Sequence, residues 1–129
     1  MKNIKIILVD DHIVLRNGLK LLLESEQNIS IVGEASSYSE LKAILQQTPT
    51  DILLLDLSIP DKHGLEIIKE LKDSNVNFKI LVFTMHSEEQ YIKSAMSAGA
   101  SGYVEKSEVD TELLTAINTV AQGNIYLNS

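Results

Sequence analysis

The chain has 129 residues and a formal net charge of −7, with 44% apolar residues, 22% charged residues and no cysteine. This length and composition predict one globular domain with a single hydrophobic core, and the missing cysteine excludes disulfides and thiolate metal sites. The acidic balance argues against nucleic-acid binding by this domain. Because it has neither a run of roughly 20 apolar residues nor a secretory cleavage site, we expect a cytoplasmic protein that spans no membrane.

Five short apolar runs alternate with helix-length segments along the chain. The runs are Ile4–Val9, Ile29–Val32, Ile52–Leu55, Phe78–Phe83 and Tyr103–Val104. The first, third and fourth are nearly continuous, as in parallel strands that are buried on both faces. The second alternates weakly and the fifth is very short, so both are predicted to be edge strands.

The segments between the runs carry a helical period. The apolar stripe of the first segment is Leu15, Leu19, Leu22 and Leu23, that of the fourth is Tyr91, Ile92, Ala95 and Met96, and that of the last is Leu113 or Leu114, Ile117, Val120 and Ala121. Ser37 and Glu40 have capping-box spacing, and Gly33 and Gly99 are predicted to lie in connections.

Five strand–helix units predict an α/β fold, a doubly wound parallel sheet of five strands with helices on both faces. An eight-fold barrel would need about twice this length. In an open sheet of this kind, ligands bind beyond the carboxyl ends of the strands, where the winding direction reverses.

Polar residues stand at these carboxyl ends. Asp10-Asp11-His12 follows the first run, Asp56 the third, Thr84 the fourth and Lys106 the fifth. If the first and third strands are neighbours, three carboxylates meet, and two carboxylates about 5 Å apart repel by roughly 3 kcal/mol at an effective dielectric near 20. Oxygen ligands of this kind select a hard cation such as Mg²⁺.

Each residue also has a structural interpretation. Asp11 is placed to cap the following helix, Asp56 precedes a proline-containing turn, and Thr84 and Lys106 are ordinary at a strand end and on a surface. The coincidence of all of them on one rim favours a functional site. A zinc site is disfavoured because the three histidines lack ligand spacing: His12, His63 and His86.

Asp10-Asp11, Asp56 followed by Pro60 and Gly64, Thr84, and Lys106 resemble, in order and spacing, the bacterial response-regulator receiver domains of two-component systems. The resemblance covers essentially the whole chain. Asp10-Asp11-His12, Thr84-Met85-His86-Ser87 and the ending Gly123-Asn124-Ile125-Tyr126-Leu127 resemble the NarL/FixJ (LuxR-type) branch.

The resemblance implies a flavodoxin-like receiver fold with strand order 2-1-3-4-5, formed by residues 1–129. Members of the branch usually continue into a C-terminal helix-turn-helix domain that binds DNA, and no such domain fits within this length. We therefore expect a truncated sequence rather than a single-domain regulator.

The resemblance also implies roles for individual residues in a phosphorelay. Asp56 would be the phosphoacceptor, receiving the group from a sensor histidine kinase or from a small donor such as acetyl phosphate. Mg²⁺ would be held by Asp11, Asp56 and the backbone carbonyl of Ser58, with Asp10 acting through water. Lys106 and Thr84 would bind phosphoryl oxygens.

In such a domain phosphorylation would change the conformation rather than begin a catalytic cycle. Thr84 would swing toward the phosphate and Tyr103 would turn inward, although Tyr103 also fits an edge-strand residue packed on the last helix. Phosphorylation would favour a homodimer. DNA would be bound only through an output domain, so that the domain regulates transcription without being a turnover enzyme.

Three features depart from the pattern. Ser107 replaces the usual cis proline after Lys106, which leaves the peptide cis or trans. The stretch Asp61-Lys62-His63 adds charge beside the site. Met85 is bulkier than the usual residue after the threonine and is expected to narrow access to Asp56, with Ser58 and His86 tuning the lifetime of the phosphate.

Three other functions fit parts of the pattern. An aspartyl phosphatase would carry Asp-x-Asp after the first strand, whereas Asp10 and Asp11 are adjacent and Asp56 follows the third. An FMN-binding flavodoxin would need a hydroxyl- and glycine-rich loop where this chain has two acids. A pseudo-receiver that only docks partners is disfavoured by the intact acidic set.

Overall fold

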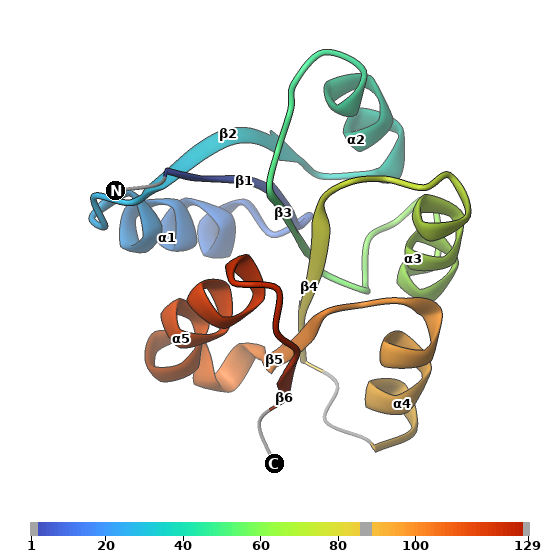
Figure 1. Ribbon diagram of the computed structural model, residues 1–129. Coiled ribbons are helices and arrows are strands. Elements are labelled where there is room, and N and C mark those ends of the chain that lie inside the picture. Colours follow the sequence, from blue (N-terminus) through green and yellow to red (C-terminus); the bar gives the residue numbers. More distant parts are fainter. Residues whose placement is uncertain (1–2, 86–88, 128–129) are drawn as a thin grey trace.

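One parallel sheet of six strands forms the centre of the computed structural model, which describes residues 3–85 and 89–127 (Figure 1). The strand order is β2-β1-β3-β4-β5-β6. The strands are β1 (Ile4–Val9), β2 (Ile29–Ala35), β3 (Ile52–Leu55), β4 (Lys79–Thr84), β5 (Gly102–Glu105) and β6 (Tyr126–Leu127). The helices are α1 (Ile13–Glu24), α2 (Tyr38–Leu45), α3 (Gly64–Asp73), α4 (Glu89–Ala98) and α5 (Val109–Ala121), with a 3₁₀ turn η1 (Lys106–Glu108) before α5.

The predicted order of the first five strands is confirmed, but the predicted number of strands is wrong. A sixth strand, β6, pairs in parallel with β5, Gly102 opposite Tyr126 and Tyr103 opposite Leu127. A strand of two residues is too short to show a period in the sequence. Tyr126 is held in place by packing against the apolar cluster beside α5. Consequently β5 is an inner strand, and only β2 of the two predicted edge strands lies at an edge.

A second correction concerns Gly33, which lies inside β2 and not in a connection. The pairing of β1 with β2 shifts register there, because Ile6 lies opposite Ile31 but Ile7 lies opposite Gly33. A Cβ on Gly33 would come within 3.0 Å of the Ile44 side chain, so a larger residue at this bulge would require Ile44 to shift. Gly99 does lie in a connection, with φ of +122°.

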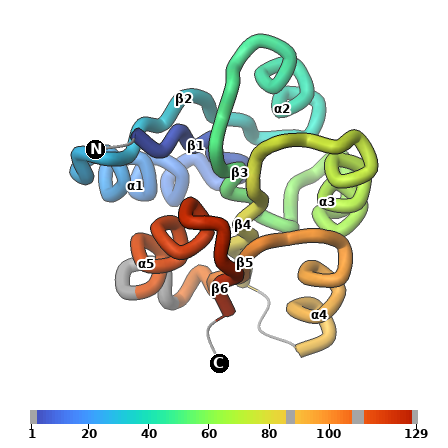
Figure 2. Tube along the Cα trace, viewed as in Figure 1, coloured from blue at the N-terminus to red at the C-terminus, as the bar shows by residue number. Residues whose placement is uncertain are grey.

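Two apolar clusters fill the space on the two faces of the sheet. One lies under α2, α3 and α4 and includes Leu41, Ile67 and Ala95, and the other lies under α1 and α5 and includes Leu23 and Ile117. The tube in Figure 2 shows the same division, with α1 and α5 on one side and α2, α3 and α4 on the other. The three predicted helical stripes face these clusters, with two exceptions: Leu22 is half-buried and belongs to neither cluster, and Ala121 is exposed.

The predicted start of α2 is confirmed, with a modified capping box. The Ser37 hydroxyl accepts a hydrogen bond from the Glu40 backbone N–H at 3.1 Å. The Glu40 carboxylate in turn accepts from the backbone N–H of Ser36, one residue before the cap, at 2.7 Å.

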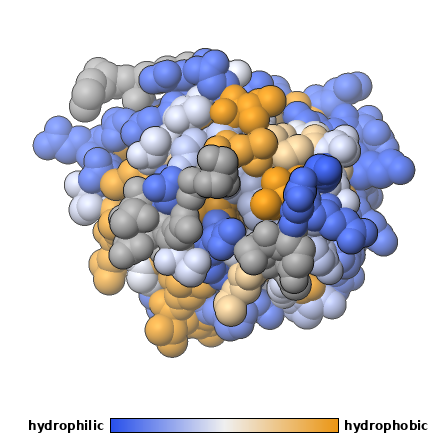
Figure 3. All heavy atoms as spheres, turned by 90° about the horizontal axis from the view of Figure 1, so that it is seen from below, coloured by the Kyte–Doolittle hydropathy of each residue, from blue (hydrophilic) through white to orange (hydrophobic). Residues whose placement is uncertain are grey.

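Large apolar side chains reach the surface at six described positions: Ile13, Val14, Leu21, Met85, Ile125 and Leu127. The face seen from below Figure 1 shows apolar side chains in separate groups among hydrophilic ones (Figure 3). Within the described residues, every helix is too short or too polar to cross a lipid bilayer.

Candidate functional site

Asp10 and Asp56 lie side by side at the carboxyl ends of two neighbouring strands. Val9, the last residue of β1, is paired with Leu55, the last residue of β3, so the two following residues leave the sheet at the same level. Both aspartates are completely buried. The reversal of winding between β1 and β3 therefore places two acids at the position that the rule for open α/β sheets assigns to a ligand.

The two carboxylates are held in the same way. Each uses its Oδ1 atom to accept a hydrogen bond from the backbone N–H two residues further on, Asp10 from His12 at 2.8 Å and Asp56 from Ser58 at 3.0 Å. These Asx turns fix both side chains at the strand ends. The turn interpretation of Asp56 is therefore correct, and it does not compete with a functional role because Oδ2 remains for other contacts.

Lys106 reaches both Oδ2 atoms. Its Nζ lies 2.9 Å from Asp56 Oδ2 and 3.3 Å from Asp10 Oδ2, and its side chain is only 8% exposed. The residue opens η1 directly after β5, and the Lys106–Ser107 peptide is trans, so that the alternative left open by the sequence is resolved. The ammonium also lies 5.3 Å from the centroid of the Phe83 ring.

The buried charges do not balance, because two carboxylates face one ammonium. Burial raises the pKa of Asp56 above its ordinary value, while the hydrogen bonds from Lys106 and the Ser58 backbone act in the opposite direction. Among the described residues Asp10 Oδ2 finds no hydrogen-bond partner, and its contact with Lys106 is a longer ion pair. A buried carboxylate oxygen without a hydrogen-bond donor is suited to a cation.

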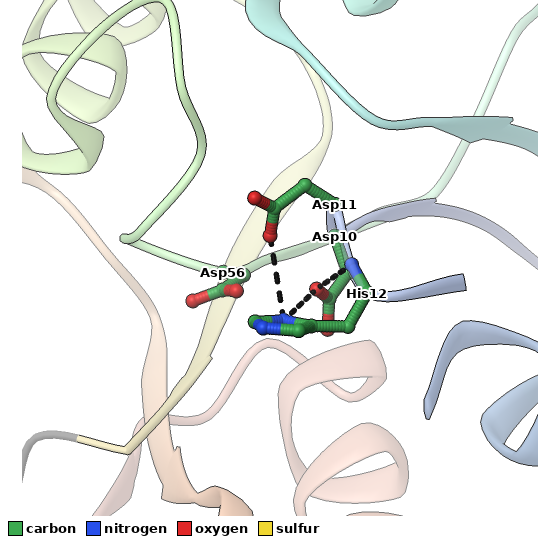
Figure 4. Close-up of side chains that lie close together, drawn as sticks. All are labelled: Asp10, Asp11, His12 and Asp56. Atoms are coloured by element: carbon green, nitrogen blue, oxygen red, sulfur yellow. Dashed lines mark hydrogen bonds and ion pairs between the residues drawn. The ribbon is translucent and has the colours of Figure 1, made fainter. Parts of the chain in front are cut away.

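Asp11 and His12 complete a cluster of side chains, together with Asp10 and Asp56, that fits a divalent ion. Ligand atoms from Asp10, Asp11, His12 and Asp56 all lie within 4.8 Å of one another. Figure 4 shows the His12 ring beside the Asp10 and Asp11 carboxylates, with Asp56 opposite. Asp11 does not cap α1, because the N-cap residue is His12, which makes no side-chain capping bond.

Two residues of the site, His12 and Arg16, were given no role in it from the sequence. His12 Nδ1 lies 3.1 Å from Asp10 Oδ1 and 3.3 Å from Asp11 Oδ1. Arg16, one turn into α1, donates to the Asp10 backbone carbonyl and pairs with Glu34 of β2 at 3.1 Å. Arg16 thereby connects the segment after β1 to the neighbouring strand β2. The one sequence feature that could have indicated this role is its position in the helix that follows Asp10.

Asp61, the first residue of the charged stretch that was predicted beside the site, binds the start of α2. Its two carboxylate oxygens accept hydrogen bonds from the backbone N–H groups of Tyr38 and Ser39 at the start of α2, at 2.8 and 3.0 Å. These donors hold the pKa of Asp61 below its usual range. The carboxylate connects the loop after Asp56 to α2, and the effect of its charge on the site stays a prediction.

Gly64 determines how closely α3 approaches this loop. Its backbone N–H donates to the Leu57 carbonyl at 3.2 Å. A Cβ at position 64 would lie 2.5 Å from the Leu57 Cα, a clash with backbone that no side-chain movement relieves. Glycine is therefore required where α3 begins.

The remaining predicted residues lie as follows. Thr84 is buried at the end of β4, on the same rim as Asp56. Tyr103 is also buried, and it packs in the cluster that contains Ala95 of α4, not against the last helix. Met85 is 78% exposed and lines an open pocket with Leu15, Lys106 and Ser107. His86 and Ser87 lie outside the described residues.

Known proteins resemble this chain along nearly its whole length. The model of the response regulator receiver domain matches residues 6–118. The response regulator UvrY of Escherichia coli is 35% identical over 98% of this chain and 58% of that protein. The nitrate/nitrite response regulator protein NarL of Escherichia coli is 34% identical over 95% of this chain and 57% of that protein.

Solved structures agree with the sequence relatives. A LuxR-family two-component response regulator from Aurantimonas sp. SI85-9A1 superposes with a TM-score of 0.91 at 34% identity, over 97% of this chain and 89% of the other. The isolated receiver domain of RcsB from Salmonella enterica serovar Typhimurium, determined with phosphomimetic BeF₃⁻, gives a TM-score of 0.92 at 27% identity, over 99% of this chain and 95% of that one.

The chain belongs to the response regulator receiver domain family, in the NarL/FixJ (LuxR-type) branch. It is thus a receiver domain of the two-component signalling type. It spans about three fifths of the length of the curated relatives that it matches.

Proposed function

We propose that Asp56 accepts a phosphoryl group in a reaction that needs a divalent cation. The observation that carries this proposal is the buried arrangement of Asp56 and Asp10, whose Oδ2 atoms share one ammonium, that of Lys106. An acid that is buried, fixed by a backbone hydrogen bond and paired with a lysine has the positioning and the neighbouring positive charge that phosphoryl transfer requires.

In the proposed step a carboxylate oxygen of Asp56 forms a bond to phosphorus while the bond from phosphorus to the leaving atom breaks. The leaving atom is the acetate oxygen of acetyl phosphate or the imidazole nitrogen of a phosphohistidine, and it keeps the electron pair. Phosphoryl transfer of this loose kind depends mainly on positioning and on charge neutralisation. Lys106, now against the Asp56 carboxylate, supplies positive charge to the transferred oxygens.

The cation would be Mg²⁺, held by Asp11, Asp56 and the Ser58 backbone carbonyl, with Asp10 acting through water. When bound, this ion offsets negative charge on the carboxylates and on the phosphoryl group. The net negative charge of the site and the buried Asp10 Oδ2, which has no hydrogen-bond partner, support its presence. Mg²⁺ commonly uses one or two protein carboxylates and phosphate oxygens.

The product would alter the domain through Thr84 and Tyr103. We propose that the Thr84 hydroxyl binds a phosphoryl oxygen and that Tyr103 occupies its buried position in the phosphorylated state. The surface that changes would comprise α4, β5 and α5. A shift from 1% to 99% of the active state requires about 5.5 kcal/mol, more than one hydrogen bond contributes, so the cation, Lys106 and Thr84 would act together. Met85, beside Lys106, would restrict access to Asp56, and with Ser58 and His86 it would set the lifetime of the phosphate.

The proposed partner is a sensor histidine kinase, and phosphorylation would favour a homodimer. Binding to DNA and regulation of transcription would require an output domain outside residues 1–129. Support comes from a related structure of two RcsB dimers bound to two parallel DNAs, which superposes over 99% of this chain and 65% of the RcsB chain with a TM-score of 0.92 at 27% identity. In this scheme the domain accepts one phosphoryl group per signalling event and is not a turnover enzyme.

Intact-mass spectrometry after incubation with acetyl phosphate and Mg²⁺ tests the proposal. We expect about one phosphoryl group per chain, removed by hydroxylamine as an acyl phosphate is, absent with EDTA and absent in Asp56→Asn. Asp73→Asn, which changes an exposed acid at the end of α3, is the matched control and should label normally. A hydroxylamine-resistant label, or undiminished labelling of Asp56→Asn, would refute the assignment, and continuous release of phosphate would indicate a phosphatase instead.

A further inference from the structure

The side chain of His12 contacts two carboxylates of the site and makes no capping hydrogen bond to α1. One nitrogen, Nδ1, contacts carboxylate oxygens of two different residues, at 3.1 Å from Asp10 and 3.3 Å from Asp11. Nδ1 carries at most one hydrogen, which cannot point fully at both oxygens. The ring is 61% exposed, so an ion can reach it from solvent.

The spacing of these atoms is that of ligands around one ion. Ligands about 2.1 Å from an octahedral ion lie about 3.0 Å apart when adjacent and about 4.2 Å apart when opposite. The contacts of 3.1 and 3.3 Å fit adjacent ligands, and the 4.8 Å limit that encloses atoms of Asp10, Asp11, His12 and Asp56 is close to the larger value. The buried Asp10 Oδ2, which has no hydrogen-bond partner and only a 3.3 Å ion pair with Lys106, is a second and independent sign that a cation belongs here.

We propose that His12 Nδ1 is a direct ligand of the divalent ion and that it widens the choice of ion from Mg²⁺ to transition metals. This inference rests on the divalent site of the proposed function. A neutral imidazole with its proton on Nε2 offers a lone pair at Nδ1. Imidazole suits Ni²⁺ and Zn²⁺, whereas a site of carboxylate, carbonyl and water oxygens alone suits Mg²⁺ and Mn²⁺.

The sequence supplies a clean pair of variants for the test. His12→Asn removes the imidazole but keeps a residue that caps α1 well. His63→Asn is the matched control, because His63 is also an N-cap residue, of α3, where its Nδ1 accepts from the Leu65 backbone N–H at 3.2 Å. Both variants replace a histidine by an asparagine at a helix start, and only one changes the cluster that fits the divalent ion.

Two measurements are made without any phosphodonor. Calorimetry gives the dissociation constants of Mg²⁺ and Ni²⁺, and electron spin echo spectroscopy of the Mn²⁺-loaded protein, labelled with ¹⁵N-histidine, detects a nitrogen bound to the metal. We expect nitrogen coupling in the wild type and in His63→Asn and none in His12→Asn. The preference for Ni²⁺ over Mg²⁺ should fall at least about tenfold in His12→Asn, since losing even a hydrogen-bond partner behind a metal ligand costs about that much.

Coupling that persists in His12→Asn, or an unchanged ratio of the two dissociation constants, would overturn the inference. Binding of both ions by a wild type that shows no nitrogen coupling would overturn this inference alone. Failure of the wild type to bind either ion would overturn both the inference and the divalent-ion step of the proposed function.

Discussion

Replacing Lys106 by methionine isolates the charge at the centre of the site. Methionine keeps the apolar length of the side chain and removes the ammonium that lies 2.9 Å from Asp56 and 3.3 Å from Asp10. The two acids have ligand oxygens no more than 4.8 Å apart. At an effective dielectric of 20 two charges at this distance repel by about 3.5 kcal/mol.

We expect Lys106→Met to lower the free energy of unfolding by about 3–5 kcal/mol at pH 7 without divalent ions, the usual result of removing one partner from a buried ion pair. Urea unfolding followed by circular dichroism measures it. Lys93→Met is the control, because Lys93 and its partner Glu89 are 74% and 81% exposed, and a surface pair of this kind contributes at most about 1 kcal/mol.

The effect of pH has a defined sign. Burial raises the pKa of Asp56 in the folded protein, so its stabilising contribution is complete below the ordinary value of about 3.9 and is lost as the pH rises through the folded pKa. Without Lys106 that pKa rises further. The deficit of Lys106→Met should therefore be small near pH 4 and largest near pH 8.

Mg²⁺ should restore part of the loss, because an ion at one hundred times its dissociation constant stabilises the folded state by about 2.7 kcal/mol. A deficit no greater than that of Lys93→Met would contradict the reasoning. The reasoning would also be contradicted if Lys106→Met lost the same unfolding free energy at pH 4 and pH 8, or if Mg²⁺ did not reduce that loss.

Substitutions at Asp61 and Gly64 test how the loop after Asp56 is held, and one at Gly18 tests a glycine inside a helix. Asp61→Ala removes the acceptor of the Tyr38 and Ser39 N–H groups and should lower the thermal unfolding midpoint. The pKa of Asp61 is lowered, so the stabilisation is present above the ordinary aspartate value and is lost as the pH falls through the folded pKa. The loss of thermal midpoint in Asp61→Ala should therefore be smaller in acid. Asp61→Asn should recover part of the lost midpoint. Gly64→Ala, with its 2.5 Å approach to the Leu57 backbone, should cost about 1–3 kcal/mol in urea unfolding. Gly18→Ala in α1, where an added Cβ meets no atom within 4 Å, should instead stabilise by about 0.5–1 kcal/mol.

The strands were predictable where burial is continuous. Ile4–Val9 and Ile52–Leu55 agree with the structure at both ends, because strands buried on both faces are nearly continuous apolar runs, interrupted here by the exposed Lys5. The sequence does not show β6, whose two residues are defined by pairing with β5 and by the packing of Tyr126. The bulge at Gly33 depends on the register of β1 against β2, which no local pattern encodes.

The rim of the site followed from topology, and its finer contacts did not. Parallel strands bring their carboxyl ends to one edge, so Asp10 and Asp56 were expected to meet there. The contact of His12 with both acids depends on the extended backbone at the start of α1, with φ of −91° and ψ of 99°. The partners of Asp61 lie 22 and 23 residues earlier in the chain, beyond the reach of a local motif.

Chemical trapping of the phosphorylated residue tests the account most directly. Borohydride reduces an aspartyl phosphate to homoserine, and peptide mapping then locates it among the three acids of the site. The account predicts homoserine at position 56 alone, dependent on Mg²⁺ and on the phosphodonor. Homoserine at Asp10 or Asp11, or at none of the three in a protein that has taken up phosphate, would contradict it.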